Sequence, residues 1–130
     1  MRSVMLSDET NAWIDQVMPD LGGIRNVRIY VCSRLPFAWL PGFGRRFDGL
    51  TLWRSVYIHE RAGAPGEKND CWMELLFHEL VHVEQFRRAP LAFPFWYLWK
   101  LARMGYCAHP AEIEACERGA KLMQKWKPDA

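Results

Sequence analysis

A five-residue motif inside an apolar stretch constrains the fold of this chain most. Residues 78–82 read His-Glu-Leu-Val-His, and hydrophobic side chains occupy most other positions between 70 and 88. A helix that is apolar nearly all round is buried, and Pro90 predicts where this one ends. Positions i and i+4 of a helix share a face, so His78 and His82 should point the same way. Buried polar groups without partners cost roughly 1–3 kcal/mol each. The motif therefore predicts a buried helix whose histidines have specific partners.

The spacing of the two histidines is typical of a metal site. Two imidazoles on one helical face can bind one metal ion, and zinc is the ion expected for this pattern. Glu79 lies one step round the helix, where it can act as a general base on a water in the ion's open position. The alternative interpretation is a helix with two half-buried histidines and a solvated glutamate. Burial of the helix favours the metal site.

A zinc site of this kind needs a third protein ligand. The candidates lie downstream, at His109, Glu112, Glu114 and Glu117. Pro110 predicts the first turn of a final helix that runs to about residue 126. On this helix Glu112 shares a face with small and apolar residues, whereas Glu114 and Glu117 share the opposite face with basic residues and fit solvated i,i+4 bridges to Arg118 and Lys121. Glu112 is therefore the favoured ligand. The alternative is a first-turn glutamate favoured by the helix dipole.

These residues resemble the gluzincin metallopeptidases. In that family an H-E-x-x-H helix is followed by a helix with an E-x-E-A-D type segment, here Glu112-Ile113-Glu114-Ala115-Cys116. The resemblance spans about residues 26–126 and implies that His78, His82 and Glu112 bind zinc. It places Cys116 where the family has an aspartate that orients a ligand histidine. The strands ahead of the motif resemble the minimal zincin core, in which an edge strand binds extended peptide.

The rest of the chain predicts a small α+β domain. The expected elements are a capped helix from Ser7 to Met18, strands at 27–32, 50–53 and 56–59, and loops at 35–44 and 63–69. The last two strands form either a tight hairpin or one bent strand. Asp70 is the expected N-cap of the motif helix. Arg45, Arg46 and Lys68 are expected to be ordinary solvated charges.

Composition and charge limit the compartment and the partners. The 130 residues fit one domain, 1–130. A net charge of +2 without a basic stripe disfavours nucleic acid. The four cysteines show no C-x-x-C spacing, so we expect small buried hydrophobes. The first eleven residues lack the apolar core of a signal peptide, so we expect a cytoplasmic protein with reduced thiols.

The segment 91–106 is aromatic and apolar, and three interpretations remain open for it. It is too short to span a bilayer. It is either a core helix beside the zinc site, which is the favoured interpretation, an interfacial membrane helix, or a surface that docks a partner. Arg87 and Arg88 just before it would suit an anionic lipid surface.

Together these features predict a minimal zincin-like fold with a sheet of about three strands packed on the motif helix and the final helix. The expected function is zinc-dependent hydrolysis of a peptide or protein substrate, which would pair with an edge strand near residues 56–60. Glu79 is the general base, and Tyr106 or His109 is the candidate donor to the oxyanion. The alternative is a non-catalytic zinc-bound module that docks a partner or a membrane through the segment 91–106.

Overall fold

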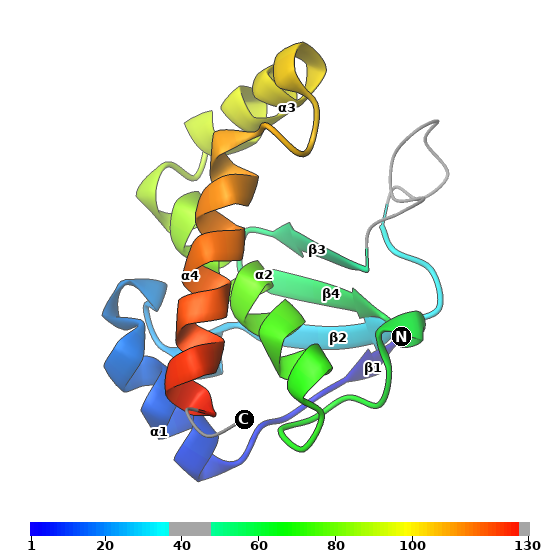
Figure 1. Ribbon diagram of the computed structural model, residues 1–130, viewed down its shortest axis with the longest axis vertical. Helices are drawn as coiled ribbons and strands as arrows, with labels where there is room; N and C mark the ends of the chain where they lie inside the picture. Colours follow the sequence, from blue (N-terminus) through cyan, green and yellow to red (C-terminus); the bar gives the residue numbers. More distant parts are fainter. Residues whose placement is uncertain (37–47, 128–130) are drawn as a thin grey trace.

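The computed structural model describes residues 1–36 and 48–127 of the chain (Figure 1). The fold is α+β. Its elements are β1 (Arg2–Ser3), α1 (Asp8–Val17), β2 (Arg28–Cys32), β3 (Gly49–Leu52), β4 (Ser55–His59), α2 (Asp70–Arg88), α3 (Ala92–Met104) and α4 (Pro110–Trp126). Short 3-10 turns occur at Pro19–Leu21, Ile24–Asn26 and Glu60–Ala62. Most of the loop expected at 35–44, and both Arg45 and Arg46, lie outside the described residues.

The sheet has four strands in the described residues, in the order β1-β2-β4-β3, rather than the expected three. The additional strand is β1, where Arg2 pairs with Val31 of β2 in antiparallel register. β2 and β4 are parallel, and β3 and β4 are antiparallel. The β3–β4 connection is a tight hairpin in which Trp53 takes a positive φ of 54°.

The position of the β3–β4 hairpin determines which strand lies at the edge of the sheet. β4 lies between β2 and β3, so its backbone groups are paired on both sides. The expectation that substrate pairs with residues 56–60 is therefore wrong. Among the described strands, the edge on this side of the sheet is β3. The sequence left open a tight hairpin or one bent strand, and it did not show which of the two segments pairs with β2.

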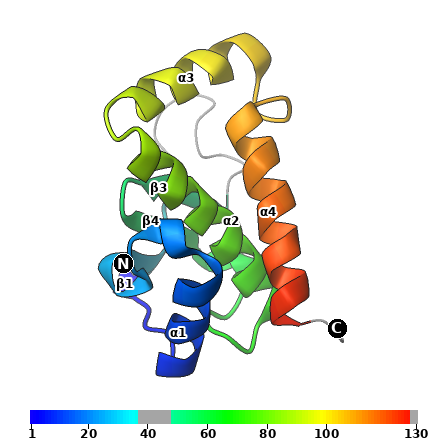
Figure 2. The same ribbon diagram turned by 90° about the vertical axis from the view of Figure 1, so that its left-hand side faces the viewer.

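α2 is the central helix, and it packs on the sheet and along α4 (Figure 2). Twelve of its residues are buried, which confirms the expected burial of the motif helix. The helix begins one residue earlier than expected, because Asn69 rather than Asp70 is the N-cap and its side chain accepts a hydrogen bond from the Trp72 amide. α1 begins with the expected serine cap, in which Ser7 Oγ accepts from the Thr10 amide at 3.2 Å.

Two features bring α4 close to α2. Gly119 lies directly against the motif, and a Cβ atom at that position would meet the His78 backbone nitrogen at 3.2 Å. Glu84 of α2, which is 1% exposed, pairs with Arg118 of α4. The expected surface bridge between Glu114 and Arg118 is thus replaced by a pair between helices whose carboxylate is buried and whose guanidinium is partly exposed. Such a pair needs both members, because removing one leaves an uncompensated charge in the interior.

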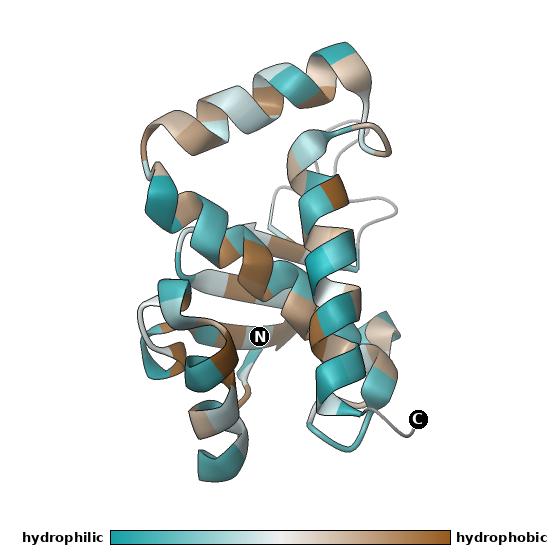
Figure 3. Ribbon diagram, turned by 60° about the vertical axis from the view of Figure 1, so that its left-hand side comes forward, coloured by the Kyte–Doolittle hydropathy of each residue, from teal (hydrophilic) through white to brown (hydrophobic). Residues whose placement is uncertain are grey.

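α3 lies across one end of the molecule, remote from α1, and joins the end of α2 to the start of α4 (Figures 1 and 2). Phe93 is its one buried residue and packs on Phe86 of α2 with ring centroids 4.8 Å apart. Hydrophobic segments recur along its length (Figure 3). None of the helices in the described part of the chain is both long and apolar enough to cross a membrane.

Candidate metal centre

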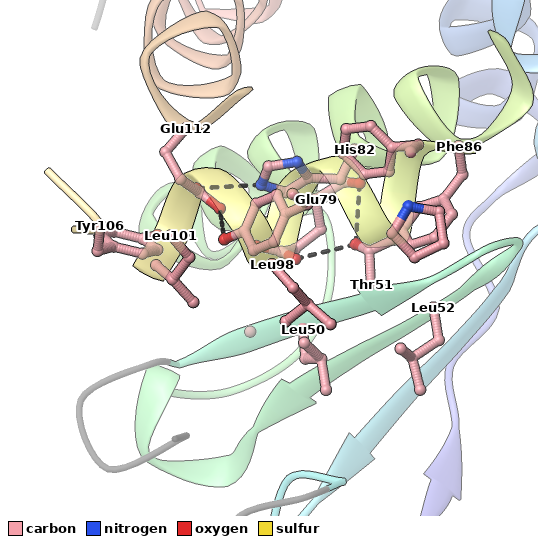
Figure 4. A pocket seen from close by; sticks show the side chains of 14 residues that line it. Leu50, Thr51, Leu52, Glu79, His82, Phe86, Leu98, Leu101, Tyr106 and Glu112 are labelled. Carbon is pink, nitrogen blue, oxygen red and sulfur yellow. Dashed lines mark hydrogen bonds and ion pairs between the residues drawn. The ribbon is translucent and has the colours of Figure 1, made fainter. Parts of the chain in front are cut away.

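Three side chains from two helices converge at one point. His78 and His82 come from successive turns of α2, and their ring centroids are 5.0 Å apart. Glu112 comes from the first turn of α4 and is 5% exposed. Its Oε1 atom lies 2.9 Å from His78 Nε2 and 3.1 Å from His82 Nε2. The structure therefore brings together the three residues that the sequence predicted as ligands. Figure 4 shows Glu112 and His82 facing one another.

The hydrogen bonds of Gln85 determine which ring nitrogen of a neutral His82 carries the proton. The Gln85 amide nitrogen donates to the Ala111 carbonyl at 3.1 Å and to Glu114 Oε1 at 2.7 Å. Gln85 Oε1 must therefore be the atom that lies 2.7 Å from His82 Nδ1, where it accepts a hydrogen bond. This places a proton on Nδ1 and, in the neutral ring, a lone pair on Nε2. That lone pair faces a carboxylate oxygen, so either a second proton or a cation must lie between them.

The charges at this point shift two pKa values strongly. Burial alone would lower the pKa of His82, but the hydrogen bond to Glu112 and the charges of Glu79 and Glu112 raise it to about 9. Burial alone would raise the pKa of Glu112, but hydrogen bonds from both histidines and the His82 charge hold it well below the ordinary value. The carboxylate is therefore ionised and suited to bind a cation.

The geometry fits a divalent metal. The ligand atoms of His78, Glu79 and His82 lie within 4.8 Å of one another, so this group could hold a metal ion. Zinc bonds of 2.0–2.2 Å in a tetrahedral site put neighbouring ligand atoms about 3.4 Å apart. The distances from Glu112 to the two histidines are a few tenths of an ångström shorter, and a small rotation of one glutamate side chain makes up the difference. Glu112 thus matches the third ligand better than Glu79, whose carboxylate has other partners.

Glu79 is held by strand β3 beside the histidines. Thr51 Oγ1 is a hydrogen-bond donor within reach of both Glu79 Oε1, at 2.9 Å, and the Glu79 carbonyl, at 3.1 Å. Glu79 Oε2 lies 3.9 Å from His78 Nε2. A Cβ atom at Gly49 would come within 3.0 Å of this carboxylate, so only glycine leaves it in place. Burial raises the pKa of Glu79, which makes it a stronger base.

The contacts of His109 differ from those expected of a donor to the oxyanion. It is fully buried, its Nδ1 accepts from the Ala111 amide as the N-cap of α4, and its Nε2 lies 2.9 Å from the Tyr97 carbonyl. Both ring nitrogens are committed to the backbone, so His109 does not serve as a donor to a reacting group. Its ring stacks on Tyr97 at 4.1 Å. Tyr97 in turn donates to Glu112 Oε2, so His109 acts by positioning Tyr97.

Tyr106 lies beside the convergent side chains. It lines a cavity of about 270 Å³ that reaches Glu79, His82 and Glu112 (Figure 4). Burial and the nearby Glu112 carboxylate raise the pKa of Tyr106, so its hydroxyl stays protonated. Apart from its polar end the cavity is lined by aliphatic and aromatic side chains from α2, α3 and β3. These are Leu50, Leu52, Phe86, Phe93, Pro94, Leu98 and Leu101, together with Tyr97.

The far side of His78 has a weaker partner. Cys116 Sγ lies 3.7 Å from His78 Nδ1, at the position where the resemblance places an aspartate. All four cysteines are free. Only Cys32 is buried, whereas Cys71, Cys107 and Cys116 are exposed. The expectation of four buried cysteines is therefore wrong for three of them.

Four residues of the site were not anticipated, namely Gly49, Thr51, Gln85 and Tyr97. Gln85 carried a signal, since it is a polar residue one helical turn beyond His82 in a helix predicted to be buried. The others belong to elements whose position relative to α2 is set by the fold. Glu114, expected on the surface, instead accepts from Gln85 and pairs with Arg88 at 3.5 Å.

No protein-family model matches the chain, and no curated protein or solved structure matches it either.

Proposed function

We propose that this protein is a zinc-dependent hydrolase of peptide bonds in the cytoplasm. The observation that carries the proposal is the convergence of two imidazole nitrogens and one carboxylate oxygen from two helices, with a second buried carboxylate beside them. His78, His82 and Glu112 would hold the ion. Two histidines and one glutamate form a catalytic zinc ligand set that leaves a coordination position for water.

A zinc ion held there would lower the pKa of its water and polarise the substrate carbonyl. Glu79 accepts the proton from the attacking water and returns it to the leaving amine. Thr51 holds the Glu79 carboxylate in place during both transfers. The hydroxyl of Tyr106 is the candidate donor to the developing oxyanion, whereas that of Tyr97 is donated to Glu112.

The cavity supports a substrate that brings an apolar group to the site. Its polar end consists of the reacting residues, and its walls are aliphatic and aromatic. Strand β3 forms one wall through Leu50 and Leu52. An extended peptide that paired with this edge strand would lie beside Glu79.

Metal analysis of five proteins tests the proposal. Wild type and Glu79→Gln should each carry about one zinc per chain, because Glu79 is not a ligand. His78→Ala and His82→Ala should carry none. Stoichiometric zinc in a protein that lacks both histidines would refute the assignment of the ligands.

Activity is tested by digestion of a peptide library, read by mass spectrometry. Wild type should cleave and Glu79→Gln should not, since the amide cannot accept the proton of water. Equal cleavage by the two proteins would mean that another group is the base. Zinc binding without cleavage by either protein would favour the non-catalytic module.

A further inference from the structure

The outer face of α3 is apolar and exposed. Leu91, Phe95 and Trp99 follow one another at helical spacing, and they are 79%, 77% and 55% exposed. The opposite face holds Phe93 and Tyr97, which pack on the rest of the protein. α3 is therefore apolar on both faces while only one of them packs on described parts of the chain. Isolated exposed hydrophobic residues are common, but a continuous stripe of this size marks an interaction surface.

Trp53 extends this surface beyond the helix. It is 47% exposed, and its indole nitrogen donates to the Pro90 carbonyl at 2.8 Å, just before α3 begins. Its ring also packs on Phe86, 5.3 Å between centroids. The exposed apolar surface therefore includes Trp53, which contacts the α2–α3 connection, as well as the outer face of α3.

The charges near α3 indicate which kind of partner binds this surface. Residues 85–111 contain no aspartate or glutamate and four basic residues, Arg87, Arg88, Lys100 and Arg103. This segment carries +4 in a chain whose net charge is +2, so the remaining residues carry −2. Lys100 Nζ and Arg103 Cζ lie 5.3 and 5.1 Å from the Trp99 ring centroid. Arg87 donates to the Asp20 carbonyl and Arg88 pairs with Glu114. Lys100 and Arg103 are therefore the two positive charges beside the exposed aromatic stripe.

We propose that α3 docks this protein on the surface of a lipid bilayer that contains anionic phospholipids. A helix with Trp, Phe and Leu on one side and Lys and Arg beside them is typical of helices that lie in the plane of the interface. Phe95 and Trp99 would enter the acyl boundary, while Lys100 and Arg103 would contact the phosphate groups. α3 has thirteen residues and lies on the bilayer rather than across it. The proposal requires neither zinc nor catalysis.

Vesicle cosedimentation tests this surface. The protein is mixed with vesicles of phosphatidylcholine alone, or of phosphatidylcholine with phosphatidylserine, at low and at high salt. Wild type should bind the anionic vesicles and be released by salt. Phe95→Ser with Trp99→Ser should weaken binding by at least about tenfold, because two large apolar side chains no longer enter the apolar part of the bilayer. Lys100→Glu with Arg103→Glu should weaken it by about fivefold or more for each charge.

Matched control variants distinguish the effect of the α3 stripe from the effect of removing any exposed hydrophobic residue or reversing any exposed charge. Met5→Ser removes an equally exposed hydrophobic residue at the other end of the molecule, and Lys121→Glu with Lys125→Glu reverses two exposed charges on α4. Both controls should bind as wild type does. None of the substituted residues is buried, so circular dichroism should show an unchanged fold for every variant.

Two outcomes would overturn the proposal. One is a wild-type protein that stays in the supernatant with anionic vesicles. The other is binding that survives the Phe95→Ser and Trp99→Ser pair. A dimer in solution that this pair dissociates, without vesicle binding, would assign the stripe to a second copy of the chain instead.

Discussion

Replacing Gln85 by alanine tests the network that holds His82. The substitution removes the acceptor of the His82 Nδ1 proton and the donor to Ala111 and Glu114. Losing such an orienting partner typically costs 10–100-fold in metal affinity, which corresponds to about 1.4–2.7 kcal/mol. The buried imidazole N–H and the Ala111 carbonyl also lose their partners, which costs roughly 1–3 kcal/mol of folding stability each.

Gln85→Glu separates these two effects. A carboxylate still accepts the proton of His82 Nδ1, so zinc should bind at least as tightly as in wild type. It cannot donate to Ala111 or Glu114, and its charge faces the Glu114 carboxylate, so stability should fall. Alanine should therefore lose affinity and stability, whereas glutamate should lose only stability.

Zinc affinity is measured by competition with a chromophoric chelator, and stability by urea unfolding of the metal-free protein. Gln124→Ala, a substitution of an exposed glutamine on α4, is the control and should change neither quantity. A folded Gln85→Ala protein with wild-type zinc affinity would refute the argument that Gln85 orients a metal ligand.

Four further substitutions probe the neighbouring contacts. Glu112→Ala should lower zinc affinity by orders of magnitude, whereas Glu114→Ala should change it little; the reverse pattern in the same titration would show that the wrong carboxylate was assigned. Gly49→Ala places a methyl group 3.0 Å from the Glu79 carboxylate, so peptide cleavage should fall while zinc content, measured by metal analysis, stays the same. Cys116→Asp should raise zinc affinity about tenfold by giving His78 Nδ1 a carboxylate partner, and an unchanged affinity would show that this contact does not orient the ring.

The helices of the site could be predicted from local chemistry. Pro110 at the first position of α4 and Pro90 after α2 limit these two helices, and their interior periodicity shows which faces are buried. The buried face of α4 includes Glu112, so the third carboxylate followed from its helical position alone. The structure confirms that this face of α4 is buried, because Glu112 and Gly119 are both buried.

The position of the sheet relative to α2 could not be predicted in the same way. The hairpin turn at Trp53 shows that β3 and β4 are neighbours, but strand alternation does not show which of them pairs with β2. The parallel pairing of β2 with β4 joins residues far apart in the chain, and it leaves β3 at the edge next to Glu79. Thr51 and Gly49 reach the site only through that arrangement.

The two histidines of the motif are oriented by different contacts, and the packing of α4 on α2 explains the difference. His82 has a strong orienting partner within its own helix, at Gln85. His78 depends on α4, whose Cys116 is the contact of its Nδ1 and whose Gly119 rests on its backbone. Glu112 lies two helical turns before Gly119 on the same face, so the approach of α4 at Gly119 also sets the distance from Glu112 to both histidines. The packing of α4 on α2 therefore determines the geometry of the candidate metal centre, because the five-residue motif provides the two histidines but not Glu112.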